Sequence, residues 1–119
     1  MPARSADLKD RLSGASEITI TVTGRKSGRA ISVPIWFVHQ DDKLHLLPVQ
    51  GSDTQWYKNV LQNPKIRVKV GGTEAEVKAV PITDAPQIAA VVEKFRKKYG
   101  AGDVKKYYSK FDVAVVGGV

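Results

Sequence analysis

Hydrophobic and polar residues alternate most strictly over residues 17–23, where isoleucine and valine side chains face one way and threonines the other. Alternation of this kind is typical of a half-buried β-strand. A second strand is predicted over residues 30–38, which are apolar at both parities, so we expect both of its faces to be covered. Because Pro34 has no N–H to donate to a ladder, this strand should lie at a sheet edge or a bulge. A third strand, residues 44–49, is predicted to return as its hairpin partner.

A second predicted hairpin joins residues 65–70 to residues 73–79 through a two-residue glycine turn. Counting outward from that turn places Val70 opposite Thr73 and sets the basic side chains of one strand against the glutamates of the other. Each exposed pair of this kind stabilises a sheet by about 0.2–1 kcal/mol. The lysines and arginines of this hairpin are therefore predicted to be structural, not ligand-binding.

Apolar residues spaced three or four apart predict helices between and after these strands. Ser52 or Asp53 is the expected N-cap of a helix that ends at residue 62. Thr83 or Asp84 is the expected N-cap of a helix that ends at residue 99. A final strand is predicted at residues 112–116. Antiparallel hairpins joined by short helices predict a mainly β, α+β fold, a small barrel or curled sheet in one domain over residues 1–119. The predicted helices span residues 7–12, 54–62, 83–99 and 103–109.

Composition narrows the possible chemistry. The chain has 119 residues, 26% of them charged, and no cysteine, which excludes disulfides and thiolate nucleophiles. The two histidines and the scattered acids have no triad, paired-carboxylate or metal-cluster spacing, so redox chemistry would have to come from a cofactor. No apolar run approaches the roughly 18 residues of a membrane span, and the first residues lack the apolar segment of a signal peptide. We therefore expect a cytoplasmic protein without an integral membrane segment or a metal site.

Positive charge is in excess, and part of it is concentrated in one turn. Nineteen basic against twelve acidic residues give a net charge of +7, which is typical of proteins that bind a phosphate-bearing cofactor, nucleic acid or an acidic lipid surface. Arg25, Lys26 and Arg29 fall beside Gly24 and Gly28 in a six-residue turn between the first two predicted strands. Glycines at this spacing let backbone N–H groups surround an anion, so the turn is a candidate anion clamp. A solvated hairpin turn is the alternative.

Aromatic residues follow both this turn and a second glycine loop. Trp36 lies on the second predicted strand, and Trp56 opens the helix that follows the Gly51-Ser52 loop. A planar ring with a phosphate tail would use such walls beside such a clamp, while core packing is the alternative for each tryptophan. The N-terminal end of that helix points at the Gly51-Ser52 loop, which is a second predicted position for an anion.

Several short motifs occur in a fixed order between residues 18 and 70. They are Thr23-Gly24-Arg25-Lys26-Ser27-Gly28, Pro34, Gly51, Trp56-Tyr57, Asn59 and Asn63-Pro64. This combination resembles the deazaflavin-dependent nitroreductase family, which belongs to the split β-barrel group of flavin and deazaflavin reductases. The resemblance implies a split β-barrel of the PNPOx-like, FMN-binding type that binds reduced coenzyme F-420, an 8-hydroxy-5-deazaflavin with a phosphate and an oligoglutamate tail. It also implies hydride transfer to a small acceptor such as a nitro compound, a quinone or an activated C=C bond.

Carried over by position, the resemblance implies a set of contacts for the cofactor and the acceptor. The acidic tail and phosphate would be held by Arg25, Lys26, Ser27 and Gly28. The ring would be lined by Ser32, Pro34, Val49, Gln50, Gly51 and Trp56. Candidates for the acceptor side are Trp36, Tyr99, Tyr107 and Tyr108. Similar proteins commonly have lysine and arginine where this chain has Gln50 and Ile31, so FMN, bound through one phosphate, is the alternative cofactor.

Two other hypotheses stay open on the sequence. One is an FMN-binding split-barrel reductase, and the other is a non-catalytic basic module that binds nucleic acid or an anionic membrane surface. Against the basic module, much of the strand charge is paired and the aromatic residues form no stacking platform, so no nucleic-acid partner is expected. Split barrels often pair through their sheets, and Trp36, Val38 and Leu47 are candidates for a homodimer interface.

Overall fold

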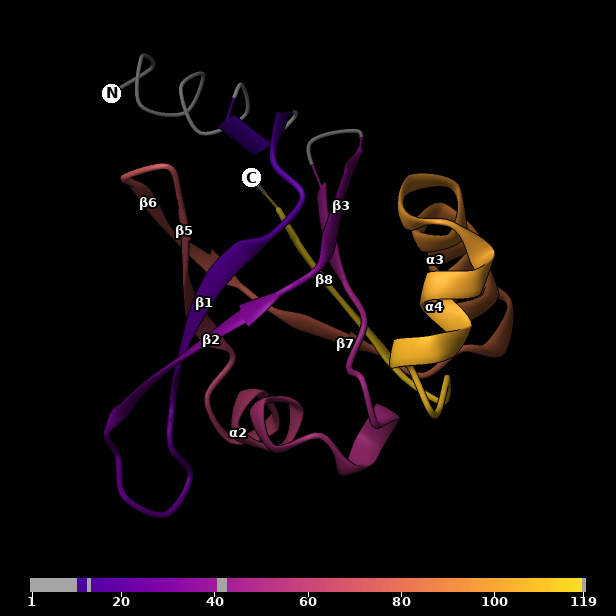
Figure 1. Cartoon of the computed structure of the whole chain (residues 1–119). Helices are drawn as coiled ribbons and strands as arrows, with labels where there is room; N and C mark the ends of the chain where they lie inside the picture. Colours follow the sequence, from indigo (N-terminus) through magenta and orange to yellow (C-terminus); the bar gives the residue numbers. More distant parts are fainter. Residues whose placement is uncertain (1–10, 13, 41–42, 119) are drawn as a thin grey trace.

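Two antiparallel four-stranded sheets form the body of the molecule (Figure 1). The structure is a computed structural model, which describes residues 11–12, 14–40 and 43–118. In spatial order the first sheet contains β2 (Ala30–Ile35), β1 (Ile18–Thr23), β5 (Lys65–Val70) and β6 (Thr73–Lys78). The second contains β3 (Phe37–Gln40), β4 (Lys43–Leu46), β8 (Ala114–Gly118) and β7 (Val80–Ile82). The chain changes sheet three times. It passes directly from β2 to β3 and from β6 to β7, each time at a sheet edge, and it passes from β4 to β5 through the helical segment between them.

The helices lie against the ends and the outer side of these sheets (Figure 1). A short 3-10 helix, η1 (Gly51–Asp53), leads into α2 (Gln55–Gln62), which contacts β1. The later helices, α3 (Ala85–Tyr99) and α4 (Ala101–Tyr107), pack on each other, and α3 contacts β3. The mainly β, α+β class predicted from the sequence is confirmed.

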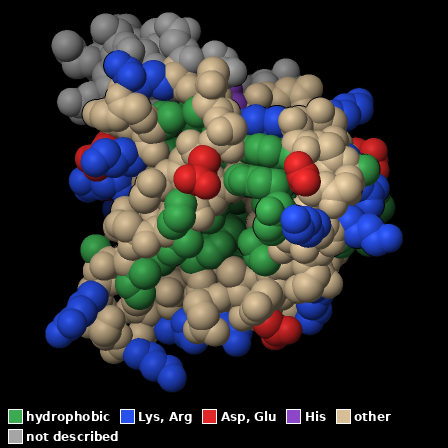
Figure 2. All heavy atoms as spheres, viewed as in Figure 1, with side chains coloured by type: hydrophobic (Ala, Val, Ile, Leu, Met, Phe, Trp, Pro, Cys, Tyr) green, Lys and Arg blue, Asp and Glu red, His purple; other side chains and the backbone are tan. Residues whose placement is uncertain are grey.

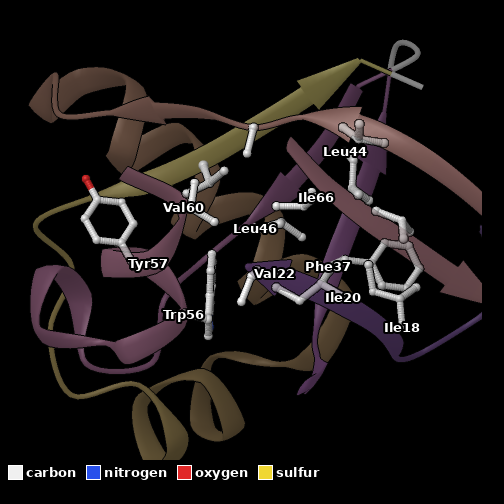
Figure 3. Close-up of a cluster of buried hydrophobic side chains, with 14 of the residues drawn as sticks. Ile18, Ile20, Val22, Phe37, Leu44, Leu46, Trp56, Tyr57, Val60 and Ile66 are labelled. Carbon is white, nitrogen blue, oxygen red and sulfur yellow. The ribbon is translucent and has the colours of Figure 1, made fainter. Parts of the chain in front are cut away.

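The strand pattern that is clearest in the sequence builds the main core. In β1, Ile18, Ile20 and Val22 are at most 2% exposed, and they face side chains from the second sheet and from α2. A smaller core lies between the second sheet and α3, with Phe95 at its centre. Burial of these side chains supplies most of the favourable free energy of a fold of this size. Figure 3 shows the main core, whose labelled members from other elements include Phe37, Leu44, Leu46, Trp56, Val60 and Ile66.

Local pairing follows the sequence closely. In the β5–β6 hairpin Val70 is opposite Thr73, as predicted, and Gly71 and Gly72 form the turn with φ of 53° and 84°. The basic and acidic side chains of this hairpin do pair, although diagonally, with 3.8 Å between Arg67 Nη1 and a Glu74 carboxylate oxygen. Asp84 caps α3 by accepting a hydrogen bond from the Gln87 N–H, also as predicted.

The predicted single strand over residues 30–38 is wrong. The strand breaks at Trp36, so that β2 belongs to the first sheet and β3 to the second. Neighbouring residues of this segment are both apolar because they pack into different cores. Phe37 lies in the main core and Val38 in the smaller one. The expectation that both faces of β2 are covered is also wrong, since Ile31 is 39% exposed. The edge position expected from Pro34 is confirmed, because β2 is an edge strand.

Other differences concern element ends and caps. The strand β7 was not predicted, β4 ends three residues earlier than expected, and α4 begins and ends two residues earlier. Neither Ser52 nor Asp53 caps α2, because the N-cap residue is Thr54. Its hydroxyl accepts a hydrogen bond from the Gln50 N–H at 2.8 Å, which tightens the loop before the helix. The predicted helix over residues 7–12 lies largely outside the described residues, and so do residues 41 and 42 between the two predicted strands.

Two of the three residues proposed for a homodimer interface are buried, and the third, Trp36, is partly exposed. Val38 and Leu47 are buried, at 9% and 2% exposed, in the smaller core beneath α3. Homodimerisation through Trp36, Val38 and Leu47 would therefore require the smaller core to open. Among the described residues, no helix has both the length and the apolar composition to cross a membrane. The cytoplasmic location stays a prediction.

The alternation in β1 gives a direct test of this core. We expect Ile20→Ala, which truncates a fully buried side chain, to lower the free energy of unfolding by about 2–5 kcal/mol. The neighbouring Thr21→Ala is the matched control, because Thr21 points outward and its hydroxyl only meets Ser32 Oγ at an exposed position. It should cost less than about 1 kcal/mol. Urea denaturation followed by circular dichroism measures both, and equal losses would contradict the assigned register.

Candidate functional site

A cleft of about 360 Å³ opens between the edge strand β2 and helix α4. Figure 2 shows it as a hollow lined by hydrophobic side chains near the middle of the face. Among the described residues, its lining is aromatic and aliphatic apart from one carboxylate, that of Glu17. A largely apolar hollow with few polar groups is the usual form of a site for a small organic ligand. The lining residues are Glu17, Pro34, Ile35, Trp36, Leu47, Val49, Tyr107 and Tyr108.

The cleft exists because of the change of sheet at Trp36. The indole of Trp36 stacks on the ring of Tyr99, with 4.3 Å between centroids and 9° between planes. Tyr107 meets the same indole edge-on at 5.4 Å. Aromatic pairs in these geometries gain about 0.5–1.5 kcal/mol beyond their burial. The strand break thus positions a tryptophan as one wall of the cleft, with tyrosines from α3 and α4 around it.

Hydrogen bonds to the main chain of Phe37 hold this wall in place. The Tyr99 hydroxyl accepts from the Phe37 N–H at 3.0 Å and lies within donating distance of the Phe37 carbonyl (2.8 Å) and the Ser16 carbonyl (2.9 Å). Lys98 Nζ donates to the same Phe37 carbonyl and sits 3.5 Å from the centroid of the Phe37 ring. Burial lowers the pKa of Lys98 to about 8. Tyr99 therefore supports Trp36 from behind and directs its hydroxyl to the backbone instead of the cleft.

The two tyrosines at the end of α4 differ in environment. Tyr108 is 5% exposed and packs edge-on against Phe95, whereas Tyr107 is 52% exposed. Burial, and to a lesser extent the nearby Tyr99, raises the pKa of the Tyr108 hydroxyl well above its usual range. Both residues line the cleft, and Tyr108 stays protonated at any physiological pH.

The basic turn lies at the far end of the β1–β2 hairpin and is fixed to α2. The Arg25 guanidinium donates to Asn59 Oδ1 at 2.8 Å and to Gln55 Oε1 at 2.9 Å, and the Arg25 main-chain N–H also donates to Asn59 Oδ1. Asn59 is 4% exposed, so it is a buried acceptor that the turn satisfies. Arg25 is thereby engaged with α2, while the side chains of Lys26 and Arg29 lie at the exposed end of the hairpin.

The turn is closed by its own backbone bonds. Gly28, at φ 71°, donates its N–H to the Gly24 carbonyl at 2.9 Å, and the Arg29 N–H donates to Ser27 Oγ at 3.2 Å. From Arg29 along β2 to the cleft at Ile35 is six residues, which span about 20 Å at the usual rise of a strand. The basic turn and the cleft therefore lie at opposite ends of one exposed strand edge.

The predicted second anion position, the Gly51-Ser52 loop, is filled by the protein itself. The Ser52 N–H and hydroxyl both donate to the carboxylate of Asp112, at 2.9 and 2.5 Å. Lys110 Nζ lies 3.3 Å from a carboxylate oxygen of Asp53 and 3.5 Å from one of Asp112. The hydroxyl bond from Ser52 lowers the pKa of Asp112, and its backbone N–H bond and the charge of Lys110 act in the same direction. An internal carboxylate thus occupies the place that the sequence assigned to a ligand anion.

The structure brings part of the predicted site together. Five predicted residues line the cleft, and four lie in the basic turn. Gln50 and Gly51 lie in the loop that Asp112 holds, and Ser32 faces outward from β2 towards Thr21. Trp56 is 6% exposed and packs in the main core. The cleft members are Pro34, Trp36, Val49, Tyr107 and Tyr108.

Sequence reasoning missed three residues of the cleft. Ile35 and Leu47 read as ordinary strand positions, and Glu17 as the polar residue before a strand. None carries a local signal, because the cleft forms only when α4 packs beside the end of β2. The missed Asp112 could have been suspected only from its charge, since its partner Ser52 lies 60 residues away.

Comparison with known proteins assigns the chain to a family. A family model described as "Uncharacterized protein conserved in bacteria (DUF2255)" matches residues 8–113. The chain belongs to this family. No curated protein matches it. Within the part of the chain that the structure describes, no group of three or more histidine, aspartate or glutamate side chains is arranged to hold a metal ion.

Three solved structures have a similar fold. One is an F-420-H2-dependent reductase (FDR-A), 20% identical, with a TM-score of 0.67 over 86% of this chain and 93% of that chain. Another, a domain-swapped dimer, is 19% identical, with a TM-score of 0.67 over 97% and 96%. A third, from Listeria innocua and described as a candidate pyridoxamine 5′-phosphate oxidase, is 16% identical, with a TM-score of 0.70 over 97% and 91%. Identities this low show the fold alone. The predicted split β-barrel is therefore confirmed, and the resemblance to split-barrel reductases is confirmed as a resemblance in fold.

The contact between Asn59 and the basic turn can be tested by hydrogen exchange. Asn59→Ala leaves the Arg25 N–H and guanidinium without this acceptor, so we expect a loss of about 1–3 kcal/mol in unfolding free energy and faster exchange at the Arg25 amide. Asn59→Asp keeps an acceptor oxygen and should retain most of the protection. Gln55→Ala removes only an exposed partner and is the control. Unchanged exchange in Asn59→Ala would show that the turn does not depend on α2.

Two glycines with similar backbones separate strain from steric overlap. Gly28 (φ 71°) has open space where a Cβ would lie, whereas a Cβ on Gly51 (φ 57°) would overlap Asp112 Oδ1. Gly28→Ala should therefore cost only the left-handed strain, about 1–2 kcal/mol. We expect Gly51→Ala to cost more than Gly28→Ala in thermal or urea unfolding. A smaller effect of Asp112→Ala in the Gly51→Ala background than in the wild type would identify the overlap as the cause, and additive losses would argue against it.

Proposed function

We propose that this protein is a reductase that binds reduced coenzyme F-420 along the edge of β2 and transfers its hydride to a small organic acceptor. The observation that carries the proposal is the apolar, aromatic cleft at one end of β2 together with the basic turn at the other. A ligand with a flat ring and an acidic tail needs both features, separated along one groove. The fold of the neighbours named above is compatible with it, because one of them is an F-420-H2-dependent reductase.

The ring end of the ligand fits the cleft in size and character. Its volume, about 360 Å³, falls within the range of roughly 300–1,000 Å³ that small-molecule sites occupy. Trp36 is already held by Tyr99, so its indole can pack on a planar ring without first being ordered. Pro34 and Val49 add apolar contacts from the strand edge and the neighbouring loop.

The tail end of the ligand would meet the basic turn. Arg25 is held by Asn59 and Gln55, so its role would be to anchor the turn as well as to add positive charge. Lys26 and Arg29 are exposed and carry flexible cationic side chains that can reach a phosphate or a glutamate carboxylate. The hydroxyl of Ser27 and the Gly28 backbone complete the predicted set.

When bound, the reduced deazaflavin supplies the hydride, and the residues of the cleft supply position and hydrogen bonds. Trp36 would pack on the ring, and Tyr107 would contact the flat acceptor and help to keep water out of the apolar hollow. Because burial raises the pKa of Tyr108, its hydroxyl stays protonated and can donate a hydrogen bond to an oxygen of the acceptor on which negative charge develops. The acceptor would be a nitro compound, a quinone or an activated C=C bond.

FMN is the second candidate cofactor, and one observation favours it. With Arg25 engaged by α2, two exposed cations, Lys26 and Arg29, are left in the turn. Two cations suit a single phosphate better than a long acidic tail. A homodimer also stays a proposal, supported by one neighbour that is a domain-swapped dimer.

Titration with the oxidised coenzyme tests the proposed function. We expect micromolar F-420 to quench tryptophan fluorescence, because Trp36 lines the cleft and a bound deazaflavin ring would stack near it. In a Trp36→Phe variant most of the quenching should disappear, whereas Trp56→Phe, in the main core, should keep it. Lys26→Ala with Arg29→Ala should weaken binding at least about tenfold through loss of charge-assisted bonds.

The same assay separates the two cofactors. A colourless preparation that binds F-420 and ignores FMN supports the deazaflavin, and a yellow preparation with flavin absorbance supports FMN. Absence of quenching by either compound at micromolar concentrations would refute a reductase of this kind. A gel shift with nucleic acid that weakens steeply with salt would instead support the basic binding module.

A further inference from the structure

The cleft has an uneven charge distribution. The molecule carries a net charge of +7, yet among the described residues lining the cleft the one with a formal charge is Glu17. Two lysines lie next to the aromatic wall without being among those lining residues. Lys98 is bound to the Phe37 carbonyl, and Lys106 Nζ lies 5.4 Å from the centroid of the Tyr107 ring. Glu17 therefore places a negative charge at the cleft of a positively charged protein.

Glu17 stands at the rim of the cleft, where a second groove meets it. It immediately precedes β1 and also lines a polar groove of about 490 Å³ on the outer face of the first sheet, whose other charged lining residues are Lys69 and Glu74. Its charge reaches the aromatic wall as well, since burial and, as a smaller contribution, the Glu17 carboxylate raise the pKa of Tyr99. Any ring substituent that leaves the cleft on this side has to pass the carboxylate.

We propose that Glu17 is a specificity-determining residue, which restricts the acceptor to uncharged or cationic flat compounds and rejects those with an anionic substituent on the ring. The inference rests on the proposed function for the nature of the acceptor. Its physical basis is repulsion between like charges a few ångströms apart at the rim of a hollow with apolar walls. Because Glu17 is exposed, the expected preference is about fivefold.

The test compares two ligands with the same ring system, one neutral and one with an anionic sulfonate. In a Trp56→Phe background, Trp36 is the remaining tryptophan, and its quenching by 1,4-naphthoquinone and by 1,4-naphthoquinone-2-sulfonate gives two dissociation constants. We expect the neutral quinone to bind about fivefold more tightly. In Glu17→Gln the ratio should fall to about twofold or less, and in Glu17→Lys it should reverse. Glu76→Gln, which makes the same change in net charge at an exposed site beside Lys65, should keep the original ratio.

Each outcome bears on this inference without relying on turnover. A ratio that is unchanged in Glu17→Gln and Glu17→Lys would overturn it, and so would a cleft that binds neither quinone. A ratio that moves equally in Glu76→Gln would assign the effect to net charge and would also overturn it. Failure to bind F-420 or FMN, with quinone selectivity still dependent on Glu17, would refute the proposed function and leave this inference standing.

Discussion

The stacking of Trp36 on Tyr99 is the contact on which the rest of the site depends. It forms at the single residue between β2 and β3, where the chain leaves one sheet and enters the other. The Tyr99 hydroxyl bonds to the N–H and the carbonyl of Phe37. Phe37 begins β3, which is an edge strand and so has a neighbouring strand on one side only. Without this contact, Trp36 would lose the ring that supports it, and Lys98 alone would bind the Phe37 main chain from α3. One aromatic pair thus couples the architecture of the barrel to the shape of the cleft.

Two charged side chains near the predicted ligand positions also have a structural role. Arg25 and Asp112 lie where the sequence shows ligand-binding signals, and both are bound within the chain, Arg25 by Asn59 and Asp112 by Ser52. Each charged-group hydrogen bond of this type contributes about 1.5–3 kcal/mol. What is left for a ligand is the outer part of the basic turn and the apolar cleft. The functional surface is therefore narrower than the net charge of the protein suggests.

Features set by neighbouring residues could be predicted, and features set by distant ones could not. The alternation of β1, the glycine turn of the β5–β6 hairpin and the Asp84 cap depend on residues a few positions apart, and all three are confirmed. The sheet change at Trp36 depends on Tyr99, 63 positions later, so the same apolar run was read as one strand. Of the cleft residues, Pro34 is predicted from the family resemblance and Trp36 from its position after the basic turn. Glu17 carries no such signal, because its position matters only once α4 is packed.

The bond network around Asp112 has a consequence for how a ligand would be received. The Ser109 N–H donates to the Val49 carbonyl, and Asp112 and Lys110 fasten the residues on either side. This loop is one rim of the cleft, and it is folded into place by the protein alone. Binding of a small ligand would therefore not carry the free-energy cost of ordering this loop. Fewer contacts are then needed to reach a given affinity. Such a preorganised rim also lets a small ligand associate without first waiting for this loop to become ordered.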